Sequence, residues 1–356
     1  MKIRLIGQRN NLGIGTHYAN FCDALLRRPG IGQLVEEVDF TNFGQLDQAV
    51  KESQPNDINI SFVGMDIKTY IKGVAIHWAV FESTVIVPEF LQSFKNADQV
   101  WVPSTWGRQV LINNGVSPEQ VKVVPEGVDA DRYYPVGRPC RNERFRYLFV
   151  GKYEDRKSCT ELIDAWADTM GQNKSVELII KTNYFVDAPD KWKALENHVN
   201  SKNLDNLVAV WGEYTSKQLF DLYATADVFV FPTKGEGWGL PIIEAAAMGL
   251  PIITTNYSAQ SDYLNEIADS CIFVDYRLDS IACPDYAKYY KPTNGSWGQW
   301  AIPDATSLKV ALIAAESNYQ NLAKNAVKNS EKIRKNWNWT QSVDRALVVM
   351  ESVAGF

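Results

Sequence analysis

Short apolar runs alternate with longer helical patterns along nearly the whole chain. This alternation is typical of parallel β-sheets whose two faces are covered by helices. The chain has 356 residues, which is enough for two domains of ordinary size with a core each. We therefore expect an α/β protein built from two Rossmann-like domains.

In the first half, strands are predicted at residues 2–6, 34–38, 58–63, 74–77, 99–103 and 121–124, and helices at 16–27, 88–95 and 105–113. Thr16 is suited to the N-cap of the first helix, because its hydroxyl can accept a bond from the first turn. Pro and Gly mark the polar stretch Val136–Asn142, which predicts a linker. We expect a first domain of residues 1–137.

In the second half, strands are predicted at residues 147–150, 176–181, 207–211, 228–231, 252–254 and 271–274, with helices at 159–170, 191–201, 216–224 and 240–248. Turn signals predict an irregular segment over residues 276–300. Three helices are expected after it, at 305–317, 321–336 and 340–354. We expect a second domain of residues 145–337.

The segment Gly235–Gly249 places two carboxylates, Glu236 and Glu244, around a glycine-rich turn that leaves a strand and opens a helix. Pro241 suits the first helical turn, and the glycines allow a ligand to approach the backbone closely. Both carboxylates can then reach a ligand at the carboxyl end of the strand, and carboxylates accept paired hydroxyl groups such as those of a sugar. The alternative is a solvated Glu236 and a Glu244 that only faces the helix dipole.

This segment resembles the Glu-x7-Glu signature of retaining glycosyltransferases of the GT-B fold, family 4 type, and Pro251–Leu264 continues the resemblance. The resemblance implies two Rossmann-like domains facing each other across a cleft. It also implies that the helix at about 338–356 crosses back to the first domain. By resemblance, Glu236 contacts the transferred sugar and Glu244 the nucleotide ribose. The donor-binding turn between them comprises Gly237, Trp238, Gly239 and Leu240.

A second strand-to-helix loop, Val150–Ser158, carries Lys152 and Lys157. A departing nucleoside diphosphate needs cations to offset its charge, and an acidic protein must gather them locally. Both lysines match positions that the family places on the diphosphate. The alternative for Lys157 is a solvated surface charge. Tyr214, after the strand at 207–211, lies where related enzymes hold the base.

The loop after the first strand contains Gly13-Ile14-Gly15, whose N–H groups can face a phosphate. Gly15 is therefore a candidate donor-binding residue. With Asp39 after the second strand, the loop also resembles a dinucleotide-binding fingerprint, but Tyr18 occupies the place of the third small residue. A tight turn without a ligand is the remaining alternative.

Histidines supply further candidates. The family frequently has a histidine in the cleft of its first domain, and His77 at a strand end is the better candidate for that catalytic position. His17 and Glu82 are candidates for the acceptor side, Glu82 by resemblance to a Phe-Glu-Ser motif of one branch. A lone histidine at a strand end is nevertheless commonly a structural residue.

The formal net charge of −6 argues against a protein that coats nucleic acid. The absence of long apolar runs and of a leader-like start predicts a cytoplasmic chain, with peripheral membrane contact as an alternative. Five scattered cysteines fit reduced thiols. No residue pattern indicates a metal site, and no cofactor is expected beyond the substrate.

The expected function is retaining, metal-independent transfer of a hexose in polysaccharide biosynthesis. The donor would be a nucleotide diphosphate sugar, such as a GDP- or UDP-hexose, and the acceptor a saccharide or lipid-linked saccharide. Two alternatives remain open, a sugar-nucleotide-binding protein without transfer activity and a sugar-nucleotide epimerase of the same fold.

Overall fold

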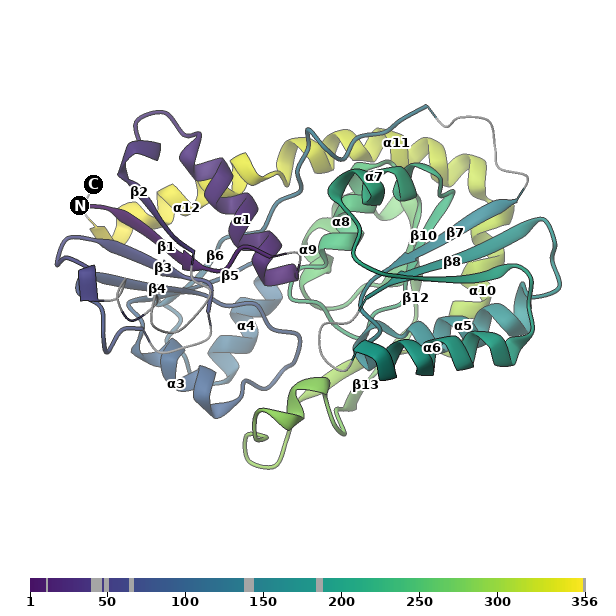
Figure 1. Cartoon of the computed structure of the whole chain (residues 1–356), viewed down its shortest axis with the longest axis horizontal. Coiled ribbons are helices and arrows are strands. Elements are labelled where there is room, and N and C mark those ends of the chain that lie inside the picture. The colour runs from purple at the N-terminus through teal and green to yellow at the C-terminus, as the bar shows by residue number, and fades with distance from the viewer. Residues whose placement is uncertain are drawn as a thin grey trace. The chain divides into compact units, whose positions relative to one another are not determined.

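The computed structural model describes residues 1–10, 12–39, 47, 51–63, 67–137, 144–183 and 188–354. It divides into two compact units, each with its own sheet (Figure 1). The first unit comprises Met1–Gly127, Tyr289–Gly298 and Trp337–Phe356, and the second comprises Val128–Lys288 and Gln299–Asn336. Much of the expected linker Val136–Asn142 falls on residues 138–143, outside the described residues.

The first unit contains a six-stranded parallel sheet in the order β2-β1-β3-β4-β5-β6. Its strands are β1 (Ile3–Gly7), β2 (Val35–Asp39), β3 (Ile58–Ser61), β4 (Val74–Trp78), β5 (Gln99–Val102) and β6 (Val121–Val123). The central strands β1, β3 and β5 are buried along their whole length, as expected for a sheet covered on both faces. The predicted strands of this half are thus confirmed to within a few residues.

Helices α1 (Gly13–Leu26), α3 (Pro88–Asn96) and α4 (Thr105–Asn113) belong to this unit, with the short η1 (Gly32–Leu34). Helix α12 (Trp339–Ala354) packs against α1. Its Ser342 hydroxyl donates to the Pro125 carbonyl at 2.6 Å, and Asp344 forms an ion pair with Arg28. The helix near the C-terminus therefore completes the unit that the N-terminus begins.

The prediction that Thr16 caps the first helix is wrong. Helix α1 begins at Gly13, and Leu12 occupies the N-cap position without a side-chain hydrogen bond. The backbone N–H of Thr16 instead donates to the Leu12 carbonyl at 2.7 Å. Glycines at the start of the helix hid this boundary, because their low helix propensity favours a later start. Tyr18, Phe21, Cys22 and Leu25 lie on the buried face of the helix.

The second unit has a six-stranded parallel sheet in the order β12-β11-β10-β7-β8-β9. Its strands are β7 (Phe145–Val150), β8 (Val176–Thr182), β9 (Leu207–Trp211), β10 (Val228–Phe231), β11 (Ile252–Thr255) and β12 (Cys271–Val274). Strands β7 and β10 are neighbours although far apart in sequence. The strand order reverses between them, and open α/β sheets bind ligands at such a point.

The helices of this unit are α5 (Cys159–Thr169), α6 (Ala188–Lys202), α7 (Ser216–Ala224), α8 (Leu240–Ala247), α9 (Ser261–Leu264), α10 (Ala305–Ser317) and α11 (Tyr319–Asn336). Short turns of 3₁₀ helix lie at η2 (Asp155–Lys157), η3 (Ser258–Gln260), η4 (Asn265–Ser270) and η5 (Asp285–Lys288). The predicted alternation of strands and helices is confirmed throughout this unit.

The prediction of an irregular segment at 276–300 is wrong in part. Strands β13 (Tyr276–Ser280) and β14 (Gln299–Pro303) pair in an antiparallel ribbon. All five residues of β13 are exposed, and its short alternation of Tyr276 and Leu278 with polar residues was outweighed by the turn signals that follow. Between the strands, Tyr289–Gly298 belongs to the first unit, where the Ser83 hydroxyl donates to the Trp297 carbonyl.

Candidate functional site

Two loops meet at the carboxyl ends of β7 and β10. The first contains η2, and the second leads from β10 to α8. The Lys234 backbone N–H donates to the Arg156 carbonyl at 2.8 Å, and the Thr233 hydroxyl donates to the same carbonyl at 3.2 Å. These bonds hold the two loops together at the point where the strand order reverses.

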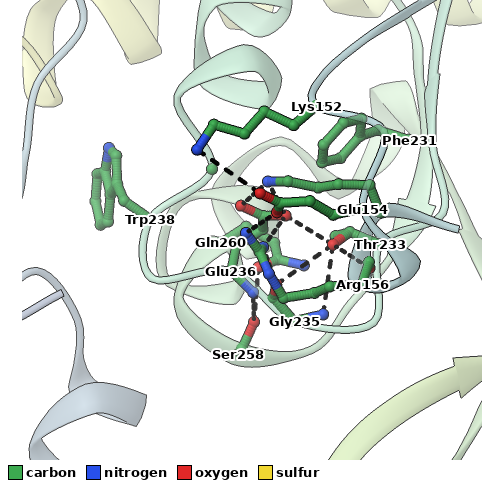
Figure 2. Close-up of polar contacts among 12 residues, drawn as sticks. Lys152, Glu154, Arg156, Phe231, Thr233, Gly235, Glu236, Trp238, Ser258 and Gln260 are labelled. Atoms are coloured by element: carbon green, nitrogen blue, oxygen red, sulfur yellow. Dashed lines mark hydrogen bonds and ion pairs between the residues drawn. The ribbon is translucent and has the colours of Figure 1, made fainter. Parts of the chain in front are cut away.

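Glu236 is the centre of the polar cluster formed by these loops (Figure 2). Only 4% of the residue is exposed. Lys157 Nζ donates to both carboxylate oxygens at 2.8 Å, and the Thr233 hydroxyl donates to Oε1 at 2.7 Å. The Glu236 backbone N–H donates to the Ser258 hydroxyl oxygen at 2.8 Å. The carboxylate is therefore buried, but well supplied with donors.

Arg156 joins the same cluster, although the sequence did not single it out. Its Nη1 donates to the Gly235 carbonyl at 2.6 Å and to Glu236 Oε1 at 2.9 Å, while Nη2 lies 3.2 Å from Glu154 Oε2. The only signal in the sequence was its place in a loop already rich in charge. Arg156 therefore fixes the Gly235 carbonyl and the side chain of Glu236, the residue that the sequence analysis placed on the sugar.

The charges around Glu236 determine its ionisation. Burial would raise the pKa of the carboxyl, but Lys157 and Arg156 hold that pKa below its usual value. The carboxylate is thus ionised at neutral pH. With Lys152 and Glu154 included, the cluster has three cations, Lys152, Arg156 and Lys157, against the two carboxylates.

Lys152 is the most solvent-exposed of these cations. Its side chain is 34% exposed, compared with 9% for Lys157 and 11% for Arg156. Its Nζ lies 3.7 Å from Glu154 Oε1, which is a loose ion pair (Figure 2). This side chain can move to an added anion without breaking a buried bond.

Lys234 stabilises the loops from a second side. Its side chain is 5% exposed, and Nζ lies 2.6 Å from Asp155 Oδ1 and 2.7 Å from Glu161 Oε1. The sequence analysis missed these pairs, because an isolated lysine before a glycine carries no distinctive pattern.

The turn from β10 to α8 depends on Gly239, which has φ of +91° at the N-cap of the helix. The Tyr263 hydroxyl lies near the carbonyls of Trp238 and Gly239, at 3.1 Å and 3.2 Å. Trp238 is 2% exposed and its ring contacts that of Tyr263. Pro241 lies in the first turn as predicted, and Gly237 and Leu240 complete the turn.

Glu244 lies in α8 beside two tyrosines, Tyr133 and Tyr223, that the sequence analysis did not single out. The Tyr223 hydroxyl donates to Glu244 Oε2 at 3.0 Å, and Tyr133 also forms a hydrogen bond with this carboxyl. Burial raises the pKa of Glu244 to about 7. The carboxyl is therefore held in a fixed orientation and titrates near neutrality.

Tyr214 follows β9 and precedes α7. Its ring is partly buried, and Lys181 Nζ lies 5.0 Å from the ring centroid. Lys181, near the end of β8, was not identified from the sequence. Together these side chains form a second polar group at the carboxyl edge of the sheet.

The candidates of the first unit are mostly interior residues. His77 is 1% exposed and its ring packs edge-on against Phe94. His17 is also 1% exposed, and burial lowers its pKa to about 3. Its ring lies among those of Phe62, Trp78 and Trp339. These placements favour structural roles for both histidines.

Gly15 lies in the first turn of α1, and Glu82 lies in a loop of the same unit. A Cβ on Gly15 would lie 2.1 Å from Asn10 Oδ1, so this glycine allows the preceding loop to fold closely over α1. Glu82 is partly buried in the segment after β4. Ser83 beside it contacts Trp297, which anchors that segment.

The described residues lack two further features. They include no cluster of three or more histidine, cysteine, aspartate or glutamate side chains arranged to hold a metal ion. None of the described helices combines the length and apolar character needed to cross a bilayer.

Comparison with known proteins locates the similarity mainly in the second unit. Residues 144–281 match the family model of glycosyl transferases group 1. Mannosylfructose-phosphate synthase of Agrobacterium fabrum is 26% identical over 174 residues, which cover 46% of this chain and 38% of that protein. The chain thus spans little more than a third of the length of this relative.

Two solved structures match nearly the whole chain. Sucrose-phosphate synthase from Thermosynechococcus elongatus gives a TM-score of 0.72 at 17% identity, with all of both chains covered. Anabaena HepE in complex with UDP-glucose gives a TM-score of 0.73 at 15% identity, covering 99% of this chain and 100% of the other. At these identities the likeness establishes the fold.

Proposed function

The chain belongs to the group 1 glycosyltransferases and has the GT-B fold, and on this premise we propose that it transfers a hexose from a nucleoside diphosphate sugar. The acceptor in this proposal is a saccharide or a lipid-linked saccharide, and the anomeric configuration is retained. The cluster around Glu236 is the observation that carries the proposal, because it lies within the matched region and gathers cations around a carboxylate.

The cations suit a diphosphate leaving group. As the bond between the sugar and the diphosphate breaks, negative charge accumulates on the phosphate oxygens. Lys152, Arg156 and Lys157 lie in one loop and can offset that charge without rearrangement of the backbone. Lys152, the most exposed of them, would meet the diphosphate first.

The two carboxylates suit hydroxyl groups. Glu236 would accept hydrogen bonds from the transferred sugar, and Glu244 from the ribose of the nucleotide. Lys157 and Arg156 both donate to the Glu236 carboxylate. Donor binding would draw Lys157 towards the diphosphate and leave the carboxylate free to accept sugar hydroxyls. Departure of the diphosphate on the face from which the acceptor approaches would retain the configuration.

The test is nucleotide release from UDP-, GDP-, ADP- and TDP-hexoses, with and without saccharide acceptors. HepE was solved with UDP-glucose, so this donor enters the panel first. Glu236→Gln should abolish release while the thermal unfolding midpoint shows that the chain remains folded. Glu196→Gln, an exposed change on α6, is the matched control and should leave release unchanged.

Three results would count against transfer. Equal activity in wild type and Glu236→Gln would remove Glu236 from the site. A thermal shift with donors but no release with any acceptor would favour a binding protein. Conversion of the donor to an isomeric sugar nucleotide without an acceptor would favour an epimerase.

A further inference from the structure

Lys181 is a buried cation outside the cluster around Glu236. It lies near the carboxyl end of β8 and pairs in register with Val150, the final residue of β7. Only 6% of the residue is exposed. Lysine is rarely buried to this extent unless a counter-ion accompanies it.

Its ammonium group has an aromatic neighbour and no anionic partner among the residues that the structure describes. Nζ lies 5.0 Å from the centroid of the Tyr214 ring, which attracts a cation through its π face. Burial lowers the pKa of Lys181, and the neighbouring charge of Glu213 opposes that shift without forming an ion pair. Burial removes the water that would surround this ammonium group, and the Tyr214 ring replaces only part of the lost interaction energy. The buried position of Lys181 therefore needs another explanation.

Lys181 lies close to the loop that carries Lys152, Arg156 and Lys157, the cations proposed to bind the diphosphate. This position supplies the explanation. Neighbouring strands lie about 4.8 Å apart, so the end of β8 is one strand from the loop that carries Lys157. The two are tied by a hydrogen bond from the Gly151 N–H to the Lys181 carbonyl at 3.1 Å. In the sheet, β10 lies on one side of β7 and leads to Glu236. Strands β8 and β9 lie on the other side of β7.

A nucleoside diphosphate sugar has its sugar at one end and its base at the other. With the diphosphate at the β7 loop and the sugar at Glu236, the base extends towards β8 and β9. Lys181 and Tyr214 lie there, and Tyr214 is followed by Thr215, the N-cap of α7, whose Tyr223 contacts Glu244. The same helix thus links the region of the ribose to that of the base.

We propose that Lys181 donates a hydrogen bond to a keto oxygen of the donor's base, and so selects uracil, thymine or guanine over cytosine or adenine. This inference rests on the proposed function. Uracil and thymine present O4, and guanine presents O6, as acceptors. Cytosine and adenine carry amino groups at the equivalent positions, which would face the ammonium donor to donor and leave it unsatisfied.

The experiment uses two pairs of nucleotides that differ chiefly at this position, UDP with CDP and IDP with ADP. Binding is measured by calorimetry for the wild type, Lys181→Met and Lys217→Met. Lys217 is a matched control because its side chain is 81% exposed on α7 of the same unit. The wild type and the control should prefer the keto member of at least one pair by about tenfold or more, equivalent to about 1.4 kcal/mol.

Lys181→Met should reduce this preference to less than about threefold, by weakening only the keto nucleotide. Its unfolding midpoint without ligand should not fall, because methionine replaces a buried ammonium that lacks a counter-ion. This second measurement shows that any lost binding does not come from a damaged fold.

An unchanged preference in Lys181→Met would overturn the inference. Equal weakening of all four nucleotides would overturn it as well, since it would place Lys181 on the phosphates or the ribose. If the wild type binds nucleotides without preferring the keto base, the inference fails and the proposed function survives. If it binds none of them, the proposed function fails and the inference with it.

Discussion

Lys157 donates to both carboxylate oxygens of Glu236, at 2.8 Å each, inside a site from which solvent is largely excluded. A buried ion pair of this kind contributes little net stability compared with a well-packed apolar pair, but losing one partner is costly. The two charges therefore depend on each other to remain buried in the folded chain.

Lys157→Ala should lower turnover by more than 10-fold, at least about 1.4 kcal/mol in the barrier, because the departing diphosphate loses a fixed cation. Steady-state rates with a saturating donor measure this effect. Lys217→Ala, at an exposed position, is the control and should retain full activity. Activity within twofold of the wild type in Lys157→Ala would remove this lysine from the mechanism.

Arg156→Gln should lower the free energy of unfolding by about 2 kcal/mol. The change removes the bonds that Nη1 donates to the Gly235 carbonyl and to Glu236, and leaves both acceptors buried. Denaturant titration provides the measurement. Arg277→Gln, whose side chain is 75% exposed, should change stability by less than about 0.5 kcal/mol. Equal effects of the two substitutions would contradict the role given to Arg156.

Glu244 should make stability depend on pH between about 4.5 and 7. Burial raises its folded pKa to about 7, from an ordinary value of 4.5. The folded chain therefore binds more protons than the unfolded chain in this window, and the free energy of unfolding falls as the pH rises through it. The penalty from this group is absent below the window and complete above it, reaching at most about 3 kcal/mol.

Denaturant titrations at about pH 5 and about pH 7.5 measure this dependence. Glu244→Gln cannot titrate, so its loss of stability between the two conditions should be smaller than that of the wild type. Identical losses would show that the carboxyl is ionised throughout the window.

Gly239→Ala should destabilise the second unit by about 1 to 3 kcal/mol. Its φ of +91° is strained for alanine, and a Cβ would lie 3.0 Å from the Tyr263 hydroxyl. Gly212→Ala separates the two causes, because Gly212 also has positive φ, of +135°, but no atom within 4 Å of a Cβ. If Gly212→Ala costs as much as Gly239→Ala, the contact with Tyr263 adds nothing.

The fold was predictable because most of its strands appear in the sequence as short, continuous apolar runs. Strands such as β9 and β10 and helices such as α4 and α7 were predicted at their observed bounds. Strand β13 was missed for the opposite reason. Its alternating apolar residues, Tyr276 and Leu278, are exposed and few, and the strand depends on pairing with β14.

The candidate site was predictable only where residue types follow one another closely in sequence. Lys157 and Glu236 were chosen from separate motifs, and the structure brings them into contact. Arg156, Lys181 and Tyr223 were missed because their importance depends on neighbours from other strands and helices. An arginine beside a lysine, or a lysine within an apolar strand, shows nothing in sequence of the group that it will face.

The sequence could not show the environment of its histidines. His17 and His77 were chosen because the family frequently has a histidine in the cleft of its first domain, and both rings are buried in the first unit. Solvent exposure is a property of the packed molecule, and the aromatic rings that cover His17 come from three separate parts of the sequence.

The place of α12 in the sequence affects when the first unit can complete its fold during synthesis. Val343, Ala346 and Met350 are buried in the first unit, which cannot complete its core until these residues have been synthesised. Domains usually fold from the N-terminus onwards during translation. Here every residue of the second unit is synthesised before α12, so the core of the first unit stays incompletely packed until α12 has been made.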